Sequence, residues 1–212
     1  MTKLICLHLK LMSKKELILQ EALTIFNSKG FEHVSTYDIA KKVGISQGNF
    51  TYHYPTKQIL INTLAKKMIN EIDHFILKVD DNFSPAELKE IFKLTFEINI
   101  KYKFIYLNYS QIVLNDPDLN EYFISNAKGR KVLLKKMLTI LSKNDYLISD
   151  DIINLTDQLA DIINLIAVYW IPESAIYHST KSNKEIINHH LDLLFLPFQP
   201  FLTKKGKLDL QN

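Results

Sequence analysis

Apolar residues recur at helical spacing over residues 13–30. One face of the expected helix contains Leu19, Ala22, Leu23 and Phe26. Intervals of three and four residues place these side chains on the same side of an α-helix. The helix is expected to begin at a capping box of Ser13 and Glu16, because the hydroxyl and the carboxylate can satisfy free backbone N–H groups there. Gly30 is its expected end.

Two shorter helices are expected after the first. Ser35 and Asp38 form a second capping box, and Gly44 can end the helix that this box begins. Ser46 can cap a third helix. Pro55 closes that helix, because a proline disfavours helical backbone at the preceding residue. The first quarter of the chain therefore predicts three short helices.

A longer helix is expected after this proline. Thr56 can cap it, and Lys57 is its expected first residue. Its inner face is expected to contain Ile59, Leu60, Leu64, Met68 and Ile72. Farther along the chain, Ser84, Pro85 and Glu87 combine an N-cap, a proline in the first turn and the acidic residue of a capping box. They predict another helix start.

The rest of the chain predicts helices that are separated by prolines and polar turns. Their expected ranges are 85–101, 103–115, 119–143, 150–170 and 183–196. We expect Asp116-Pro117 to end the second of these helices, Pro172 to follow the fourth and Pro197 to end the fifth. No segment has the sustained alternation of a strand, and no Asn-Gly or Asp-Gly hairpin turn occurs. The chain is therefore predicted to be all-α.

The last two predicted helices are apolar around more than one face. Their apolar residues include Ile152, Ile153, Leu159, Ile162, Leu165, Val168, Tyr169, Trp170, Ile186, Ile187, Leu191, Leu194 and Phe195. A helix that is hydrophobic on most sides is either deeply buried or covered by a partner. Two such helices can form half of a four-helix bundle between subunits. We expect a homodimer through helices 150–170 and 183–196.

Cysteine content and targeting signals favour the cytoplasm. A single cysteine, Cys6, excludes an internal disulfide and a cysteine-based zinc site. The apolar start of the chain resembles a signal peptide, but Lys10 interrupts it and no small-residue cleavage site follows. Met12 is an alternative start of the chain. No uninterrupted apolar run reaches the roughly 18 residues of a membrane span, so no membrane partner is expected.

Positive charge is concentrated near the beginning of the chain. Residues 1–67 contain ten lysines and four acidic residues, so their net charge is +6, whereas the remaining residues sum to −3. A basic segment joined to a slightly acidic body is typical of a protein that binds a polyanion at one end.

The two helices 35–43 and 46–54, joined by a turn at Gly44, have the lengths of a helix-turn-helix motif. In this motif the second helix lies in the major groove of DNA, and its first residues face base edges and phosphates. Gln47 and Asn49 each offer a donor and an acceptor for base edges. Gly48 lets the backbone approach a phosphate closely.

Aromatic and basic residues extend the same surface. Tyr52 and His53 can reach phosphate oxygens, and Phe50 is placed to point back at the preceding helix. Lys57 adds a positive charge at the start of the next helix, whose N–H groups form an anion site. By itself, a helical histidine such as His53 is usually packed or exposed without a function; the motif around it favours DNA contact.

Residues 13–64 resemble the DNA-binding domain of TetR-family transcriptional regulators. The matching positions are Ala22, Phe26, Gly30, Phe31, the run Ser35 to Ala40, the run Val43 to Tyr54, Lys57 and Leu60. Residues 102–123 also look like a pattern of some C-terminal domains in the family. The resemblance implies a helix-turn-helix domain at residues 1–56, with its motif at 35–54, and an effector-binding and dimerisation domain at 57–212.

The resemblance also implies roles for single residues. DNA contacts are expected from Thr36, Tyr37, Gln47, Gly48, Asn49, Thr51, Tyr52, His53 and Lys57. Thr36 and Tyr37 would meet the DNA backbone, the six residues from Gln47 to His53 would line the recognition helix, and Lys57 would clamp a phosphate. Thr51 departs from the tyrosine that is common in the family, and Tyr54 departs from the usual phenylalanine.

An aromatic group farther along the chain is a candidate for binding an apolar or amphipathic effector. Its members are Phe96, Tyr102, Phe104, Tyr106, Tyr109 and Trp170, with Asn108 or Gln111 as a polar handle. Core packing is the alternative for each of them. His178, His189 and His190 do not predict a metal site, because adjacent residues point about 100° apart on a helix.

We therefore expect a homodimeric, sequence-specific DNA-binding regulator, most simply a repressor that a small molecule releases from its operator. The alternative is a DNA-associated helical module that docks another protein and has no small-molecule effector. Catalysis is not expected, because the chain has no Gly-rich phosphate loop, nucleophile elbow or zinc-protease signature. No cofactor and no metal are expected.

Overall fold

A computed structural model describes residues 13–76, 79–149 and 151–211. The apolar start of the chain, including Cys6, Lys10 and Met12, lies outside the described residues. The residues in these ranges form helices and turns and contain no β-strand. Leu147 and Leu202 form an isolated β-bridge. The prediction of an all-α protein is confirmed.

The chain contains two compact units, of which the first ends at Ile69 and the second begins at Asn70. The division lies inside one helix. The expected boundary between residues 56 and 57 separates a DNA-binding domain from an effector-binding and dimerisation domain, and it stays a prediction.

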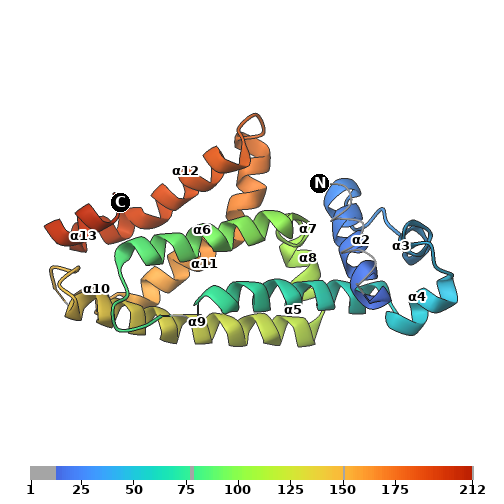
Figure 1. The fold of residues 1–212 in the computed structure, drawn as a ribbon, viewed down its shortest axis with the longest axis horizontal. Coiled ribbons are helices and arrows are strands. Elements are labelled where there is room, and N and C mark those ends of the chain that lie inside the picture. Colours follow the sequence, from blue (N-terminus) through green and yellow to red (C-terminus); the bar gives the residue numbers. More distant parts are fainter. Residues whose placement is uncertain (1–12, 77–78, 150, 212) are drawn as a thin grey trace. The chain divides into compact units, whose positions relative to one another are not determined.

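The first unit contains three short helices and the start of a long one (Figure 1). These are α2 (Lys14–Lys29), α3 (Thr36–Val43), α4 (Gln47–His53) and α5 (Lys57–Ile76). Both predicted capping boxes are present: Ser13 with Glu16, and Ser35 with Asp38. The Ser46 hydroxyl accepts a hydrogen bond from the Asn49 N–H at 3.2 Å and caps α4. The local signals of the sequence therefore set the helix starts of this unit.

The core of the first unit is formed by residues from all four helices. Its buried side chains include Ile18, Ala22, Phe26, Ile39, Ala40, Phe50, Tyr54, Leu60, Leu64 and Met68. Ile59 was expected on the inner face of α5, and this expectation is wrong because its side chain is 44% exposed. The buried stripe continues from Leu60 through Ile61, Leu64 and Ala65. Ile59 precedes this stripe by about 100° around the helix and therefore faces outward.

The second unit consists of the end of α5 and the helices that follow it (Figure 1). These are α6 (Pro85–Lys101), α7 (Lys103–Leu107), α8 (Tyr109–Leu114), α9 (Pro117–Lys143), α10 (Asp151–Asn154), α11 (Thr156–Tyr177), α12 (Asn183–Phe195), the 3₁₀-helix η1 (Leu196–Phe201) and α13 (Lys204–Asp209). Helix α11 packs against α9, α7 and α12, and α12 packs against α6. The capping box of Ser84 and Glu87 begins α6 as predicted.

The expected helix 103–115 is interrupted at Asn108, which separates α7 from α8. The Asn108 side-chain amide donates to the Phe104 carbonyl oxygen at 2.8 Å. The Asn108 backbone N–H bonds to Ile105, three residues back, at 3.2 Å. Such a side-chain bond competes with regular helix geometry and accounts for the break.

Two prolines play roles that differ from those expected. Pro117 lies at the start of α9 instead of only ending the preceding helix, because the Asp116 carboxylate caps this helix through the Leu119 N–H at 2.9 Å. Pro172 was expected to follow the end of helix 150–170, and this is wrong: α11 continues through it to Tyr177. A proline inside a helix removes one backbone hydrogen bond. The side chain of the neighbouring Ile171 is buried, and this packing helps to keep the helix intact across the proline.

Helix α11 is also long and apolar enough to cross a membrane by length and composition alone. It contains 22 residues, and an 18-residue window within it has a mean hydropathy of 1.4, with 22% of that window buried within this chain. An apolar helix of a soluble protein gives the same signal, so this finding is weak evidence for a membrane span. Asp157 and Asp161 interrupt the apolar residues of the helix.

The turn between α3 and α4 yields a testable prediction. Gly44 has φ 74° and ψ 35°, the left-handed conformation, and nothing lies within 4 Å of the position that a Cβ would take. Gly44→Ala is therefore expected to lower the free energy of unfolding by about 1–2 kcal/mol through backbone strain alone. Gly44→Asn should cost less, because asparagine tolerates this conformation. Urea denaturation measures both variants, and equal losses would contradict the strain argument.

Candidate nucleic-acid interface

Helices α3 and α4 are oriented by the turn at Gly44 and by the cap at Ser46. The Gly44 N–H donates to the Lys41 carbonyl oxygen at 3.3 Å, and the Ile45 N–H donates to the Ala40 carbonyl oxygen at 3.0 Å. These two bonds define the end of α3 at the turn. Helix α4 begins directly after Ser46 and packs against α3. The two helices form the predicted helix-turn-helix arrangement.

The inner side of α4 is held by two aromatic residues. Phe50 is fully buried, and Tyr54 is almost so. The Tyr54 hydroxyl donates to the Lys15 carbonyl oxygen on α2 at 3.5 Å. Burial raises the pKa of the Tyr54 hydroxyl to about 12, and the nearby Glu16 carboxylate adds to this shift. The hydroxyl therefore stays neutral and remains a donor at ordinary pH.

The outer side of α4 carries exposed polar and aromatic residues. Gln47, Gly48, Thr51 and Tyr52 are exposed, and His53 is half-buried. The Tyr52 side chain is 83% exposed and packs edge-on against the His53 ring at 5.2 Å. Large aromatic side chains at such exposure contribute little to a core, which makes this surface suited to a partner.

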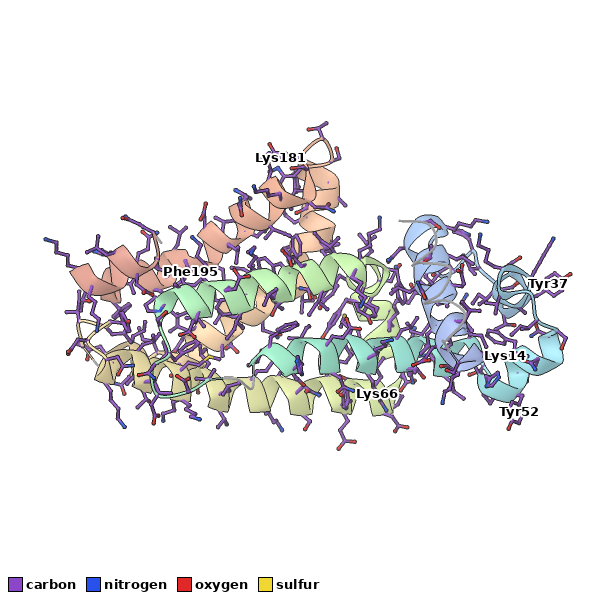
Figure 2. All side chains as sticks on the ribbon, viewed as in Figure 1. Lys14, Tyr37, Tyr52, Lys66, Lys181 and Phe195 are labelled. Atoms are coloured by element: carbon purple, nitrogen blue, oxygen red, sulfur yellow. The ribbon has the colours of Figure 1, made fainter. Side chains whose placement is uncertain are left out.

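Helix α3 adds to the same surface at its first turn. Tyr37 is 62% exposed, and both Tyr37 and Tyr52 project outward from the helices that carry them (Figure 2). Thr36 is half-buried beside it. The Gln47 side-chain amide donates to the Thr36 hydroxyl at 3.0 Å, so the first residue of α4 is bonded to the first residue of α3. The sequence carried no signal for this bond, because the two residues are eleven positions apart.

The two amide residues that were expected to read bases occupy different environments. Gln47 is exposed, whereas Asn49 is half-buried. The Asn49 Oδ1 atom is buried and has no hydrogen-bond partner among the described residues. When the oxygen of an amide is buried, only its N–H donors are available to bond with a base edge.

Lys57 lies at the start of α5, where it was expected to clamp a phosphate. Its ammonium group lies 5.4 Å from the centroid of the Phe31 ring. Burial lowers the pKa of this lysine, and the neighbouring Glu32 carboxylate opposes the shift. On α3, Lys41 and Lys42 are both exposed. These cations give the motif a positive surface.

Four of the candidate effector residues of the second unit form two ring pairs. Phe96 and Trp170 pack with ring centroids 4.7 Å apart, and Trp170 also lies 5.4 Å from the His190 ring. Tyr106 and Tyr109 stack at 6.5 Å.

Hydrogen bonds occupy several polar atoms of these candidates. The Tyr106 hydroxyl donates to the Oδ1 atom of the fully buried Asn99 at 2.6 Å. The Tyr102 hydroxyl donates to the Glu71 carboxylate at 2.8 Å. Phe104 is fully buried, and Asn108 bonds to its carbonyl oxygen. Most of these residues therefore contribute to the core, while their role in effector binding stays a prediction.

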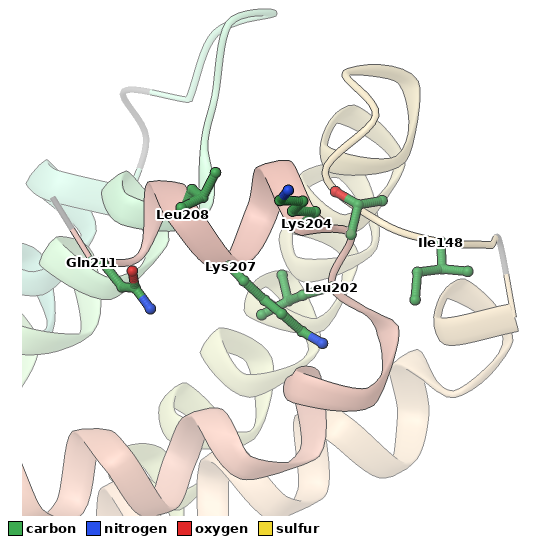
Figure 3. A pocket seen from close by; sticks show the side chains of 7 residues that line it. Ile148, Leu202, Lys204, Lys207, Leu208 and Gln211 are labelled. Atoms are coloured by element: carbon green, nitrogen blue, oxygen red, sulfur yellow. The ribbon is translucent and has the colours of Figure 1, made fainter.

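A groove in the second unit lies elsewhere, at the C-terminal helix. It has a volume of about 610 Å³ and is lined by Ile148, Leu202, Thr203, Lys204, Lys207, Leu208 and Gln211 (Figure 3). None of the candidate effector residues lines it.

Three histidines lie close together where α11 meets α12. The rings of His178 and His189 are 5.0 Å apart, and that of His190 is 5.1 Å from His189. Both ring nitrogens of His190 are occupied, since Nδ1 lies 2.9 Å from the Ile186 carbonyl oxygen and Nε2 lies 3.1 Å from Glu173. Within the described ranges, no group of three or more potential ligands has an arrangement suited to a metal ion.

This geometry agrees with comparisons to known proteins. Residues 18–64 match the model of bacterial regulatory proteins of the TetR family, and residues 68–210 match the TetR model described as a bacterial transcriptional repressor. The chain belongs to the TetR family of transcriptional regulators. Members of this family are transcription regulators and not enzymes.

Among curated proteins, the chain is similar to the biofilm operon icaADBC HTH-type negative transcriptional regulator IcaR. It is 31% identical to IcaR of Staphylococcus epidermidis over 98 residues, which span 45% of this chain and 53% of that protein. It is 28% identical to IcaR of Staphylococcus aureus over 119 residues, which span 55% and 60% of the two chains. The matched segment thus spans little more than half the length of these relatives.

Solved structures share the fold over nearly the whole chain. A TetR-family transcriptional regulator from Marinobacter aquaeolei VT8 superposes with a TM-score of 0.80 at 19% identity, covering 94% of this chain and 96% of that one. The ketosteroid transcriptional regulator KstR2 of Mycobacterium tuberculosis gives 0.62 at 16% identity, covering 91% and 96%. At these identities the likeness concerns the fold alone.

Proposed function

We propose that this protein is a cytoplasmic repressor that binds a double-stranded DNA operator through α4. The observation that carries the proposal is the outward face of α4, where Gln47, Gly48, Thr51 and Tyr52 are exposed on a helix held by buried Phe50. A recognition helix needs this division between a packed side and a polar side. The similarity to negative regulators supports repression as the outcome.

In this proposal the nine expected contacts have distinct roles. Gln47 reads a base edge, and Asn49 contributes N–H groups. Gly48 allows close backbone approach, while Thr51, Tyr52 and His53 meet phosphates along the groove. From the flanking helices, Thr36, Tyr37 and Lys57 hold the DNA backbone. Phosphate contacts position the protein, and base contacts specify the sequence.

Binding to selected operator duplexes tests this assignment. Tyr52→Ala should weaken binding to all sequences by about tenfold, because it removes one backbone contact worth about 1–1.5 kcal/mol. Lys57→Ala should reduce the slope of log affinity against log salt by about one. Lys184→Ala is the matched control, because Lys184 is an exposed lysine on α12 in the second unit. Selection from random duplexes that yields no preferred sequence would exclude a sequence-specific regulator.

We further propose that the protein dimerises through α11 and α12. Ile162, Leu165, Tyr169 and Ile176 are exposed along one side of α11. Their spacing of three, four and seven residues places these apolar side chains on one side of the helix. Leu193 is exposed on α12, which packs against α11. A second copy of the chain would cover these side chains and present two α4 helices to successive turns of DNA.

The dimer has a direct test in light scattering. Leu165 is 63% exposed, and Leu165→Asp should convert the dimer to a monomer, because the carboxylate would be buried in an apolar interface. Val132→Asp is the matched control: Val132 is 72% exposed on α9 and is not one of the residues of the α11 stripe. A wild-type monomer would contradict the proposal and favour a module that docks another protein.

We propose a small-molecule effector that reaches Trp170, one of the residues expected to bind it. Trp170 Nε1 and Ser174 Oγ are buried and have no hydrogen-bond partner within the described residues. They lie four residues apart on α11, so they share one side of the helix. An unpaired buried donor costs about 1–3 kcal/mol, which an acceptor group on an amphipathic ligand would recover. Phe96 supplies an apolar surface beside the indole ring.

The effector can be sought by challenging the protein–operator complex with medium-chain and long-chain carboxylic acids and aromatic amphiphiles. At least one compound is expected to lower operator affinity tenfold or more. Trp170→Phe should weaken that response and preserve operator affinity, because it removes the N–H donor and retains an aromatic ring. Phe201→Leu is the control, since Phe201 lies in η1 and is neither a candidate effector residue nor part of a described ring pair with one. A response that Trp170→Phe leaves unchanged would contradict this site.

A further inference from the structure

The hydrogen bond between Gln47 and Thr36 connects the two helices of the motif at the surface proposed to meet DNA. Gln47 Nε2 donates to Thr36 Oγ1 at 3.0 Å. Gln47 is exposed at the first turn of α4, and Thr36 is half-buried at the first turn of α3. The inference below rests on the proposed DNA-binding function and concerns how that site selects a base.

The bond leaves a specific pair of groups free on the glutamine. A glutamine amide has two N–H donors and one carbonyl oxygen. One N–H of Gln47 is directed to Thr36, so the oxygen and the second N–H of the same amide remain available for a base edge. In the major groove, adenine presents an N6 donor beside an N7 acceptor. The free groups of Gln47 are the complement of that pattern.

The same bond determines what the threonine can do. A hydroxyl carries one proton and two acceptor lone pairs. Because the Thr36 oxygen accepts from Gln47, its own proton remains free for a phosphate oxygen, which can only accept. The opposite orientation of the amide would use this proton for the Gln47 oxygen. Thr36 would then have no donor for the DNA backbone.

Asn49 cannot take over this role. Its Oδ1 atom is buried without a partner among the described residues, so its acceptor is turned away from the DNA. Gln47 is therefore the amide of α4 that has a free acceptor beside a free donor. A long glutamine side chain has many rotamers in solution, and a bond to a neighbouring helix reduces that freedom before DNA arrives.

We propose that Thr36 is a positioning residue for sequence recognition. Its hydroxyl holds the Gln47 amide in the orientation that reads adenine and donates its own proton to the adjacent phosphate. Base preference at one position of each half-site therefore depends on a residue that lies outside the recognition helix.

Selection from random DNA duplexes by the full-length wild-type protein and its variants tests this proposal. The wild type should enrich adenine at one position of each half-site, and Gln47→Ala should lose that preference, which identifies the position. Thr36→Val replaces the hydroxyl by a methyl group of similar size. It should reduce the adenine preference about tenfold, the scale of one bidentate base contact, and leave other positions unchanged. Thr36→Ser retains the hydroxyl and should retain the preference.

Additional measurements separate positioning from simple loss of a phosphate contact. A residue that only binds phosphate would lower affinity for all sequences equally, whereas the proposed role changes the preference at one position. Thr36→Val combined with Gln47→Ala should lose no more preference than Gln47→Ala alone. Thermal unfolding checks that the variants fold, and Thr36→Ala replaces Thr36→Val if the valine impairs folding.

Three outcomes would overturn the inference. One is a Thr36→Val protein, or its alanine substitute, that keeps the wild-type adenine preference. Another is a wild-type protein that enriches guanine at the position identified by Gln47→Ala, because guanine presents two acceptors and would require the opposite amide orientation. The third is a double variant, Thr36→Val with Gln47→Ala, whose adenine preference is lower than that of Gln47→Ala alone. If the wild type enriches no sequence at all, the proposed function itself fails, and this result differs from the other three.

Discussion

The DNA-facing surface depends on the burial of two aromatic side chains, Phe50 and Tyr54. Helix α4 has seven residues, which is too short to be stable without tertiary contacts. The Phe50 side chain packs the inner side of α4 into the core. Tyr54 follows the last residue of α4, and its hydroxyl donates to a carbonyl oxygen of α2. Burial raises the pKa of this hydroxyl to about 12, so it remains protonated even in alkaline solution. With these two rings inside, helical geometry directs Gln47, Gly48, Thr51 and Tyr52 outward.

The second unit has a different arrangement of apolar residues. Its core is formed by helices that pack around α11, while the same helix exposes an apolar stripe containing Leu165 and Ile176. One helix can serve both a core and a subunit interface because it is apolar on more than one side. Pro172 is accommodated within α11, beside Trp170 and Ser174, which carry buried donors without partners among the described residues. The proposed dimer and effector sites thus meet on one helix.

Much of the fold was predictable because its signals are local. The capping boxes at Ser13, Ser35 and Ser84 each act over three residues, and all of them begin helices in the structure. The interruption at Asn108 and the continuation of α11 through Pro172 were not predicted. Both depend on a balance between a lost backbone hydrogen bond and other contacts, and a periodic apolar pattern does not report that balance. α13 also escaped prediction, since its six residues are too few to form an apolar stripe.

Among the candidate DNA contacts, too, some features follow from local sequence signals and others follow from tertiary contacts. By itself, the sequence determined that residues 35–54 form a helix-turn-helix, because turn, caps and aromatic residues stand at fixed short offsets. Only the tertiary structure decided that Gln47 bonds to Thr36, that the Asn49 oxygen is buried and that Phe96 pairs with Trp170 and Tyr106 with Tyr109. These features join residues from different helices or turn a side chain toward the core. Side-chain directions of this kind follow from packing, which spacing along one chain does not encode.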